Sequence, residues 1–395
     1  MCEMKTTKFK MTELGPIPVD WEVKRLDEVC SITTGHKDVN QGCKNGKYPF
    51  FTCSRNVFAA NSYSFDCEAI LVAGNGDVGN LHYCKGKFEA YQRTYVLKDF
   101  SEEVSYIFHE LTYHLMRSLS DGKIGSSIPY ITIQQLEGFM LPLPSLPEQR
   151  KIAEALSDID ELISALGKLI EKKRNIKTGT MQELLGMRNE ESGMRNVPRR
   201  RLAGFSGAWV EKRLGEIASF ETATIGVDKI DGEWYIGTEN MLAEKAGVEK
   251  NLTPVPYVTV KEYKVGDVLI SNIRPYLKKI WLADRDGGCS TDVLVVRTID
   301  NRICTPMFLK MLLSDDSFFD FTMANAVGTK MPRGDKKVIE NYQVHLPTLA
   351  EQKAIAAVLS DMDAEIAALE ADRAKYERIK TGMMQELLTG KVRLE

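Results

Sequence analysis

Apolar residues return at alternating intervals of three and four positions in two long stretches of this chain. The spacing places these side chains along one face of a helix, as in the seam of a coiled coil. No Gly-Pro break interrupts the first stretch between Glu148 and Leu185, so we expect a helix about 55 Å long there. The predicted seam positions are Ile152, Leu156, Ile159, Ile163 and Leu166 in the first stretch and Ile355, Leu359, Met362, Ile366 and Leu369 in the second.

The two stretches are copies of one sequence. Residues 144–185 and 347–388 align without a gap at an offset of 203, and 23 of the 42 aligned positions are identical. Shorter openings that begin with tryptophan, at 21–29 and 209–217, also match each other. The chain therefore consists of two halves that share their edges and differ in the middle.

The divergent middle parts are rich in predicted strands. Runs of β-branched and aliphatic residues, bounded by Gly, Asn and Asp, occur at 69–74, 95–97, 267–273 and 292–298. One helix is expected in each half. Ser101 is the expected N-cap of the first, and the second opens at Thr305 with a proline in its first turn.

These patterns predict an α/β (α+β) fold built as a pseudo-twofold tandem repeat. Two globular domains are expected to be separated by two long antiparallel coiled-coil helices. The Gly, Pro and charge content after the first helix is typical of a linker. The predicted order is a first domain at 1–147, a first helix at 148–187, a linker at 188–208, a second domain at 209–349 and a second helix at 350–390.

Composition narrows the class of protein. The 395 residues carry a net charge of −3, and no apolar run approaches the 18 residues of a membrane span. The N-terminus lacks the apolar core of a signal peptide. The eight cysteines never form a CxxC pair, which is typical of free thiols in the cytoplasm and indicates no metal site. We therefore expect a cytoplasmic protein, without a membrane interaction, that contacts any nucleic acid through local basic patches or through a helper subunit.

Motifs that would indicate catalysis fail on spacing. Gly74, Gly76 and Gly79 fit GxGxxG, but the sequence after them predicts a turn and a strand instead of the helix that a dinucleotide site requires. His109 and His114 are five residues apart and do not share a helix face, as a zinc pair would. No catalytic residue is predicted.

The repeated segment resembles the specificity (S) subunits of type I DNA restriction–modification systems. The resemblance rests on LPSLPEQRKIAEALSDID and LPTLAEQKAIAAVLSDMD, on the two KTGxMQELL helix ends, and on the tryptophan-led openings. It covers nearly the whole chain. The signature itself differs between the two copies at one position, where Pro147 stands opposite Ala350.

The resemblance implies a non-catalytic DNA-recognition subunit. Each of two target recognition domains would read one half of a split, asymmetric site in double-stranded DNA. The helices would set the gap between the half-sites and dock the adenine-methylating modification (M) subunits, two for each S subunit, and restriction (R) subunits would join the complex. This chain would bind no cofactor itself, since S-adenosylmethionine, ATP and Mg would reside on the partners. The alternatives are a self-sufficient methyltransferase or nuclease, and a coiled-coil adaptor unrelated to DNA.

DNA contact requires Arg, Lys, Asn, Gln or Ser at groove depth, and Lys or Arg at phosphates. Such residues fall in or beside predicted loops in both halves. The second half is the stronger candidate, because its clusters are basic within an acidic chain. The predicted DNA-binding residues are Arg55, Asn75, Arg93, Arg274, Tyr276, Lys278, Lys279, Lys330, Arg333 and Lys336.

Overall fold

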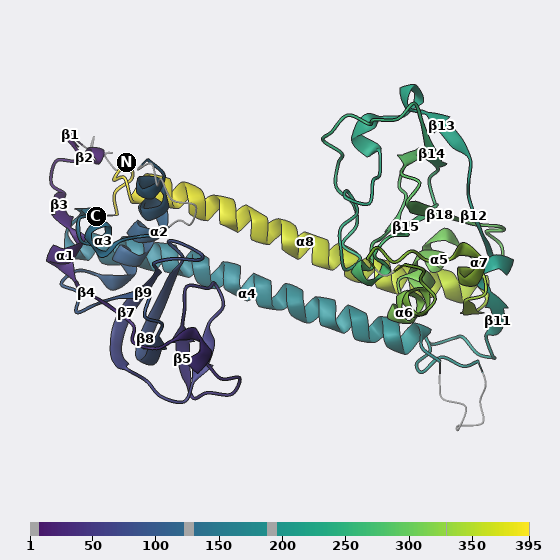
Figure 1. The fold of residues 1–395 in the computed structure, drawn as a ribbon, viewed down its shortest axis with the longest axis horizontal. Helices are drawn as coiled ribbons and strands as arrows, with labels where there is room; N and C mark the ends of the chain where they lie inside the picture. Colours follow the sequence, from purple (N-terminus) through teal and green to yellow (C-terminus); the bar gives the residue numbers. More distant parts are fainter. Residues whose placement is uncertain (1–7, 122–129, 188–195, 329, 395) are drawn as a thin grey trace. The chain divides into compact units, whose positions relative to one another are not determined.

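The computed structural model describes residues 8–121, 130–187, 196–328 and 330–394. The chain forms two compact units (Figure 1). Unit 1 comprises Met1–Leu169 and Leu369–Glu395, and unit 2 comprises Ile170–Ala368. The described helices include none that is both long and apolar enough to cross a membrane.

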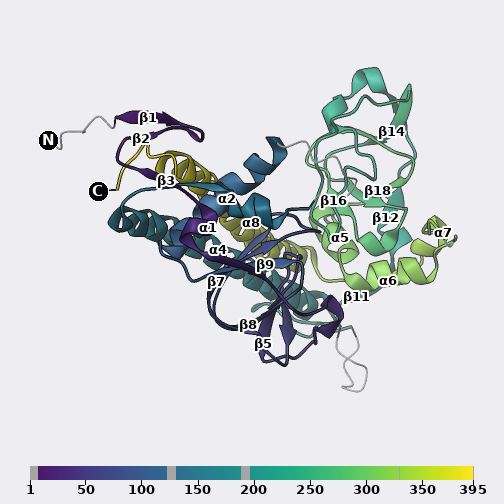
Figure 2. The ribbon, with the colours of Figure 1, turned by 60° about the vertical axis from the view of Figure 1, so that its left-hand side comes forward.

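Unit 1 is built on a six-stranded sheet with the order β4-β9-β7-β8-β5-β6. Figure 2 labels four of these strands, β9, β7, β8 and β5. All pairings are antiparallel except that of β5 with β8. Its central strand β7 holds four consecutive fully buried residues, Ala69 to Val72. The strands are β4 (Ser31–Thr34), β5 (Tyr48–Phe51), β6 (Phe58–Ala60), β7 (Phe65–Ala73), β8 (Leu81–Ala90) and β9 (Thr94–Lys98).

Shorter elements complete unit 1. A hairpin of β1 (Phe9–Thr12) and β2 (Gly15–Pro18) precedes β3 (Glu22–Arg25), which pairs with β10 (Met140–Leu143). The helices of this part are α1 (Leu26–Val29), α2 (Val104–Asp121) and α3 (Ile133–Glu137), with a 3-10 turn at Val39–Gln41.

Unit 2 repeats this plan with a smaller main sheet, of order β12-β18-β15-β16, and adds a second sheet of order β13-β14-β17. The strands β11 and β19 pair as β3 and β10 do in unit 1. The strands are β11 (Val210–Arg213), β12 (Ala218–Phe220), β13 (Thr224–Gly226), β14 (Thr259–Tyr263), β15 (Val268–Ser271), β16 (Ile280–Leu282), β17 (Gly287–Cys289), β18 (Val293–Thr298) and β19 (Gln343–Leu346).

Unit 2 also contains shorter helices. They are α5 (Pro306–Leu313), α6 (Asp316–Ala324) and α7 (Lys336–Ile339), with 3-10 turns at Leu214–Glu216, Val227–Lys229, Gly232–Trp234 and Pro275–Leu277. The mixed α/β class expected from the sequence is confirmed, and the four predicted strand runs fall on β7, β9, β15 and β18.

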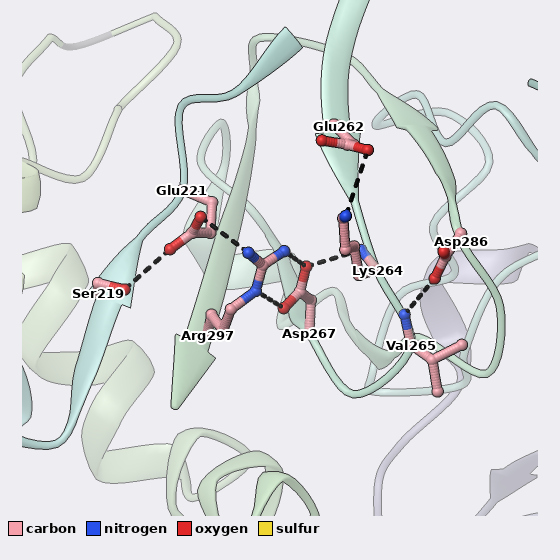
Figure 3. Close-up of polar contacts among 8 residues, drawn as sticks. All are labelled: Ser219, Glu221, Glu262, Lys264, Val265, Asp267, Asp286 and Arg297. Atoms are coloured by element: carbon pink, nitrogen blue, oxygen red, sulfur yellow. Dashed lines mark hydrogen bonds and ion pairs between the residues drawn. The ribbon is translucent and has the colours of Figure 1, made fainter. Parts of the chain in front are cut away.

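The side chain of one arginine links β18 to the start of β15 and to the residue that follows β12 in the main sheet of unit 2 (Figure 3). Arg297 on β18 donates from Nε and Nη2 to the two carboxylate oxygens of Asp267, both at 2.7 Å. Its Nη1 donates to Glu221 beyond β12 at 3.0 Å. Asp267 is 1 % exposed and also accepts the N–H of Lys264 at 2.7 Å, so a buried carboxylate is fully paired where β15 begins.

Two long helices, α4 (Leu146–Leu185) and α8 (Leu349–Leu387), each contribute one part to each unit. In unit 1 the start of α4 packs against the end of α8, and in unit 2 the end of α4 packs against the start of α8. In both units the helices therefore run antiparallel. Equivalent ion pairs join them, because Lys380 lies 2.6 Å from Asp160 in unit 1 and Lys177 pairs with Asp363 in unit 2.

The seam residues differ in burial along each helix. In α4 the buried positions are followed by Ile163 and Leu166, which are half-buried, and in α8 the buried Ile366 lies between half-buried positions that include Leu369. Ile152, Leu156, Ile159, Ile355, Leu359 and Ile366 are at most 8 % exposed, and Met362 is half-buried. The continuous coiled-coil seam stays a prediction.

The repeated Glu-Gln signature makes matching contacts at the start of both long helices. Gln149 accepts the backbone N–H of Glu103, directly before α2, at 3.0 Å. Gln352 accepts that of Thr305, directly before α5, also at 3.0 Å. Each glutamine thus joins the first turn of a long helix to the N-terminus of another helix in its unit, where backbone N–H groups lack intrahelical partners.

The same contact explains one wrong prediction. Ser101 does not cap α2, which begins at Val104, and its hydroxyl donates instead to the Val29 carbonyl at 3.4 Å. The free N–H before the helix is bound by Gln149, 46 residues away. The predicted cap at Thr305 is confirmed, since its hydroxyl accepts the N–H of Phe308.

Candidate nucleic-acid interface

The turns that follow β5, β7 and β8 meet at one corner of unit 1. The N–H of Gly74 donates to the Arg93 carbonyl at 3.0 Å, and the N–H of Arg55 donates to the Asp77 carboxylate at 3.2 Å. Asn75 lies in the same turn as Gly74 and Asp77. The structure therefore brings together the three residues that the sequence predicts for this half, with Arg55 and Arg93 exposed and Asn75 half-buried.

The GxGxxG run is the turn of this corner. It joins the antiparallel strands β7 and β8, so the predicted turn between strands is confirmed. Gly76 and Gly79 adopt φ of +65° and +76°, a conformation that glycine takes without a steric penalty.

The corresponding corner of unit 2 forms after β15. The N–H of Arg274 donates to the Pro332 carbonyl at 3.0 Å, and Ile273 forms an isolated β-bridge with Arg333. These contacts bring Arg274 and Tyr276 next to the segment that carries Lys330 and Arg333. The Tyr276 side chain is 51 % exposed, and Arg274 and Lys330 are also exposed.

The two corners occupy equivalent places in their units. The strand that precedes each corner pairs with β9 or β18 in the same way. Beyond it, the carbonyl of Gly74 accepts the N–H of Ile131 at 2.9 Å, and the carbonyl of Asn272 accepts the N–H of Gly334 at 3.3 Å. Ile131 and Gly334 are separated by the offset of 203 that relates the two repeats. By this register Arg274 stands where unit 1 has Gly76.

Several of the predicted basic residues are engaged within unit 2. Lys278 lies 3.0 Å from the Asp316 carboxylate, and Lys279 donates to the Thr238 carbonyl at 2.7 Å. Arg333 pairs with Asp292 at 3.0 Å, with its side chain still 55 % exposed. Lys336 lies in α7 and is half-buried. The Arg274 side chain makes no hydrogen bond or ion pair with the part of the chain that the structure describes.

Sequence reasoning missed two residues of this corner. Lys245 and Asp316 are joined at 2.6 Å, and Asp316 also binds Lys278. Lys245 lies in a loop and Asp316 in the first turn of α6. A separation of 71 residues leaves no local pattern in the sequence that could have identified the pair.

The side chains of His109 and Glu110 on α2 are buried. Their exposure is 2 % and 0 %, and they lie in the core of unit 1. Burial lowers the pKa of His109 to about 4, aided by the ammonium group of Lys380, and burial raises the pKa of Glu110. The Tyr106 hydroxyl donates to Glu110 at 2.9 Å, and this hydrogen bond favours the ionised carboxylate and so opposes the effect of burial on the pKa. Across residues 8–121, 130–187, 196–328 and 330–394, no cluster of His, Cys, Asp and Glu could hold a metal ion.

Comparison with known proteins gives a consistent picture. A family model described as the type I restriction modification DNA specificity domain matches residues 18–175 and again 207–380. The EcoDI specificity subunit of a type I restriction enzyme from Escherichia coli is 28% identical over 364 residues, covering 86% of this chain and 81% of that protein. The MjaVIII specificity subunit from Methanocaldococcus jannaschii is 26% identical over 432 residues, covering 99% of this chain and 97% of that protein.

A solved structure shares the fold. The crystal structure of the S subunit of a type I restriction–modification system from M. genitalium superposes with a TM-score of 0.62. The alignment covers 97% of this chain and 99% of that one at 18% sequence identity.

Proposed function

This chain belongs to the family of type I restriction modification DNA specificity domains, and we propose that it is the DNA-recognition subunit of a type I restriction–modification complex. The observation that carries the proposal is the double match, because the family domain occurs twice in one chain. Two domains of one kind suit the reading of a split site, one half for each domain.

The proposed readers are the parts at 1–147 and 209–349, and their contact surfaces are the two equivalent corners. Arg55, Asn75 and Arg93 would contact the first half-site, and Arg274, Tyr276, Lys330 and Arg333 the second. Exposed arginine can bind guanine through two hydrogen bonds in the major groove, and exposed lysine can bind phosphates. Lys278, Lys279 and Lys336 would act through the backbone that they support, because they are engaged or half-buried within unit 2.

The partners follow from the same proposal. The long helices α4 and α8 would dock modification subunits, with one subunit at each of two equivalent surfaces, and restriction subunits would join that complex. The chain itself would catalyse nothing, and the methyl donor, ATP and Mg would be bound by the partners. A self-sufficient methyltransferase is the second candidate, but no observation in the structure favours it.

Methylome sequencing tests the proposal. Cells that carry a matching modification subunit are compared with and without the gene for this chain. We expect a split, asymmetric adenine-methylated motif that appears only with the gene. A methylation pattern that is the same in both strains would contradict the proposal, as would methyl transfer to DNA by the purified chain alone.

A further inference from the structure

Two loops of unit 2 are joined into one platform beside the corner. The loop of residues 243–247 binds the loop of residues 274–279 through its backbone. The N–H of Glu244 donates to the Leu277 carbonyl and the N–H of Lys245 to the Lys278 carbonyl, both at 2.9 Å. We call these two loops the double loop.

Four residues of the double loop have a left-handed backbone conformation, which is strained for residues other than glycine. Glu244, Lys245, Arg274 and Lys278 have φ of +53°, +63°, +53° and +51°. They are four of the six non-glycine residues with positive φ in the described chain. The left-handed conformation is unfavourable for an L-residue other than glycine, and such strain is concentrated at functional sites. At the place of Arg274, unit 1 has Gly76, which meets the same backbone requirement without that cost.

One carboxylate holds both strained loops. Asp316 Oδ1 lies 2.6 Å from Lys245 Nζ and 3.0 Å from Lys278 Nζ, so it bridges a lysine from each loop. The Asp316 side chain is 53 % exposed, whereas the two lysines are 27 % and 24 % exposed. Hydrogen bonding to Lys245 lowers the pKa of Asp316, which keeps it ionised at neutral pH. While Asp316 binds them, the two lysines have an anionic partner within the protein, whereas free lysines at this surface would add to the attraction of phosphates.

We propose that Asp316 is a positioning residue that sets the specificity of the second half-site. By binding Lys245 and Lys278 it fixes the turn that presents Arg274 and Tyr276, and it keeps both lysines from phosphates of unrelated DNA. The phosphate term is independent of sequence, whereas base contacts carry the sequence information. A carboxylate that withholds two lysines therefore lowers non-specific binding more than specific binding. This inference rests on the proposed function.

The test measures DNA binding by the full chain assembled with its modification subunits. Asp316→Asn is compared with wild type and with Asp284→Asn, which removes an exposed carboxylate from an ion pair elsewhere in unit 2. For Asp316→Asn we expect affinity for unrelated DNA to rise about threefold to tenfold. The salt dependence should steepen by about one to two counterions, one for each freed lysine. In the methylome, only the half-site read by unit 2 should relax.

Further variants separate positioning from general damage. Asp316→Glu should restore most of the discrimination, and adding Lys245→Gln and Lys278→Gln to Asp316→Asn should abolish the gain in non-specific affinity. Thermal unfolding of each variant shows whether unit 2 remains folded. Equal discrimination by Asp316→Asn, Asp284→Asn and wild type would overturn the inference, as would a gain that persists without the two lysines. Failure of the wild-type complex to discriminate would instead contradict the proposed function.

Discussion

Arg393 and Glu148, 245 residues apart, form a bidentate ion pair with N···O distances of 2.6 and 2.7 Å. The carboxylate is 4 % exposed, and Arg393 also binds Asp20. Unit 2 makes the equivalent pair between Arg201 and Glu351, at 2.9 and 2.7 Å. In unit 1 an arginine that follows α8 binds the signature glutamate at the start of α4. In unit 2 an arginine that follows α4 binds the signature glutamate at the start of α8.

Loss of Arg393 should leave the buried Glu148 carboxylate uncompensated, whereas Arg393 keeps Asp20 as a partner when Glu148 is lost. We expect Arg393→Ala to lower the free energy of unfolding of unit 1 by about 3 kcal/mol, since a broken buried pair costs about 3–5 kcal/mol. Removal of residues 391–395 should have a similar effect because it removes Arg393. Denaturant unfolding measures both, with Arg302→Ala as a control whose side chain is 88 % exposed. Arg393→Ala as stable as that control would show that the pair is dispensable.

The antiparallel contacts of α4 and α8 predict that the length of these helices sets the spacing between the two half-sites. The test variant carries two insertions of four residues, one after Leu169 in α4 and one after Glu370 in α8. Both sites lie close to the point where the helix leaves one unit and enters the other. Each insertion adds about 6 Å of helix and rotates the remainder of that helix by only about 40°. We expect the unspecified gap to grow by one or two base pairs, at about 3.4 Å each.

The matched control for this design is an insertion in α4 alone. It should shift Lys177 relative to Asp363, or Asp160 relative to Lys380, and so abolish methylation. Methylome sequencing reads the gap directly. An active double-insertion variant with an unchanged gap would show that these helices do not set the spacing.

The burial of His109 predicts that unit 1 becomes less stable in acid. Burial lowers its pKa to about 4, whereas an unfolded histidine has a pKa of about 6.5. As the pH falls from about 6.5 to 4, the unfolded chain binds a proton that the native chain does not, so unit 1 loses up to about 3 kcal/mol of stability. His109→Met should remove this part of the pH dependence. Met311 is a suitable guide, because it is buried six residues after Thr305, as His109 is six residues after Glu103, and the two signature glutamines bind the N–H groups of Thr305 and Glu103.

Unfolding free energies at several pH values between 7 and 4 provide the measurement. The exposed His36→Asn serves as the control. A curve for His109→Met that is parallel to that of wild type would mean that His109 binds its proton equally well in both states.

Arg274→Gly should separate stability from recognition. Relief of the left-handed conformation should raise the stability of unit 2 by up to about 1 kcal/mol, after allowance for the entropy of glycine. Loss of a base contact should cost about 1–3 kcal/mol in binding and relax one position of the second half-site. Thermal unfolding and binding titrations measure the two effects. A variant with unchanged base preference would remove Arg274 from the reading surface.

The sequence was sufficient for features that depend on local pattern. The repeat and its heptad spacing located both long helices, because apolar periodicity is a property of neighbouring residues. Thr305 was recognisable as a cap because its partner, Phe308, is three residues away. The glycine turn at Gly74 was recognisable because no helix-forming sequence comes after it.

Features created by distant partners were not accessible in this way. The start of α2 depends on Gln149, and the orientation of Lys278 depends on Asp316. Nothing near Arg274 indicated that its backbone would adopt a conformation usual for glycine. The corners themselves appear only when the fold joins turns from separate strands.

The central claim is that two independent readers in one chain each recognise one half of a split DNA site. The most direct measurement is the methylome of cells in which residues 210–335 are replaced by the matching part of another specificity subunit. We expect one half-site to change while the other half-site and the gap between them stay the same. A change in both half-sites, or in neither, would contradict it.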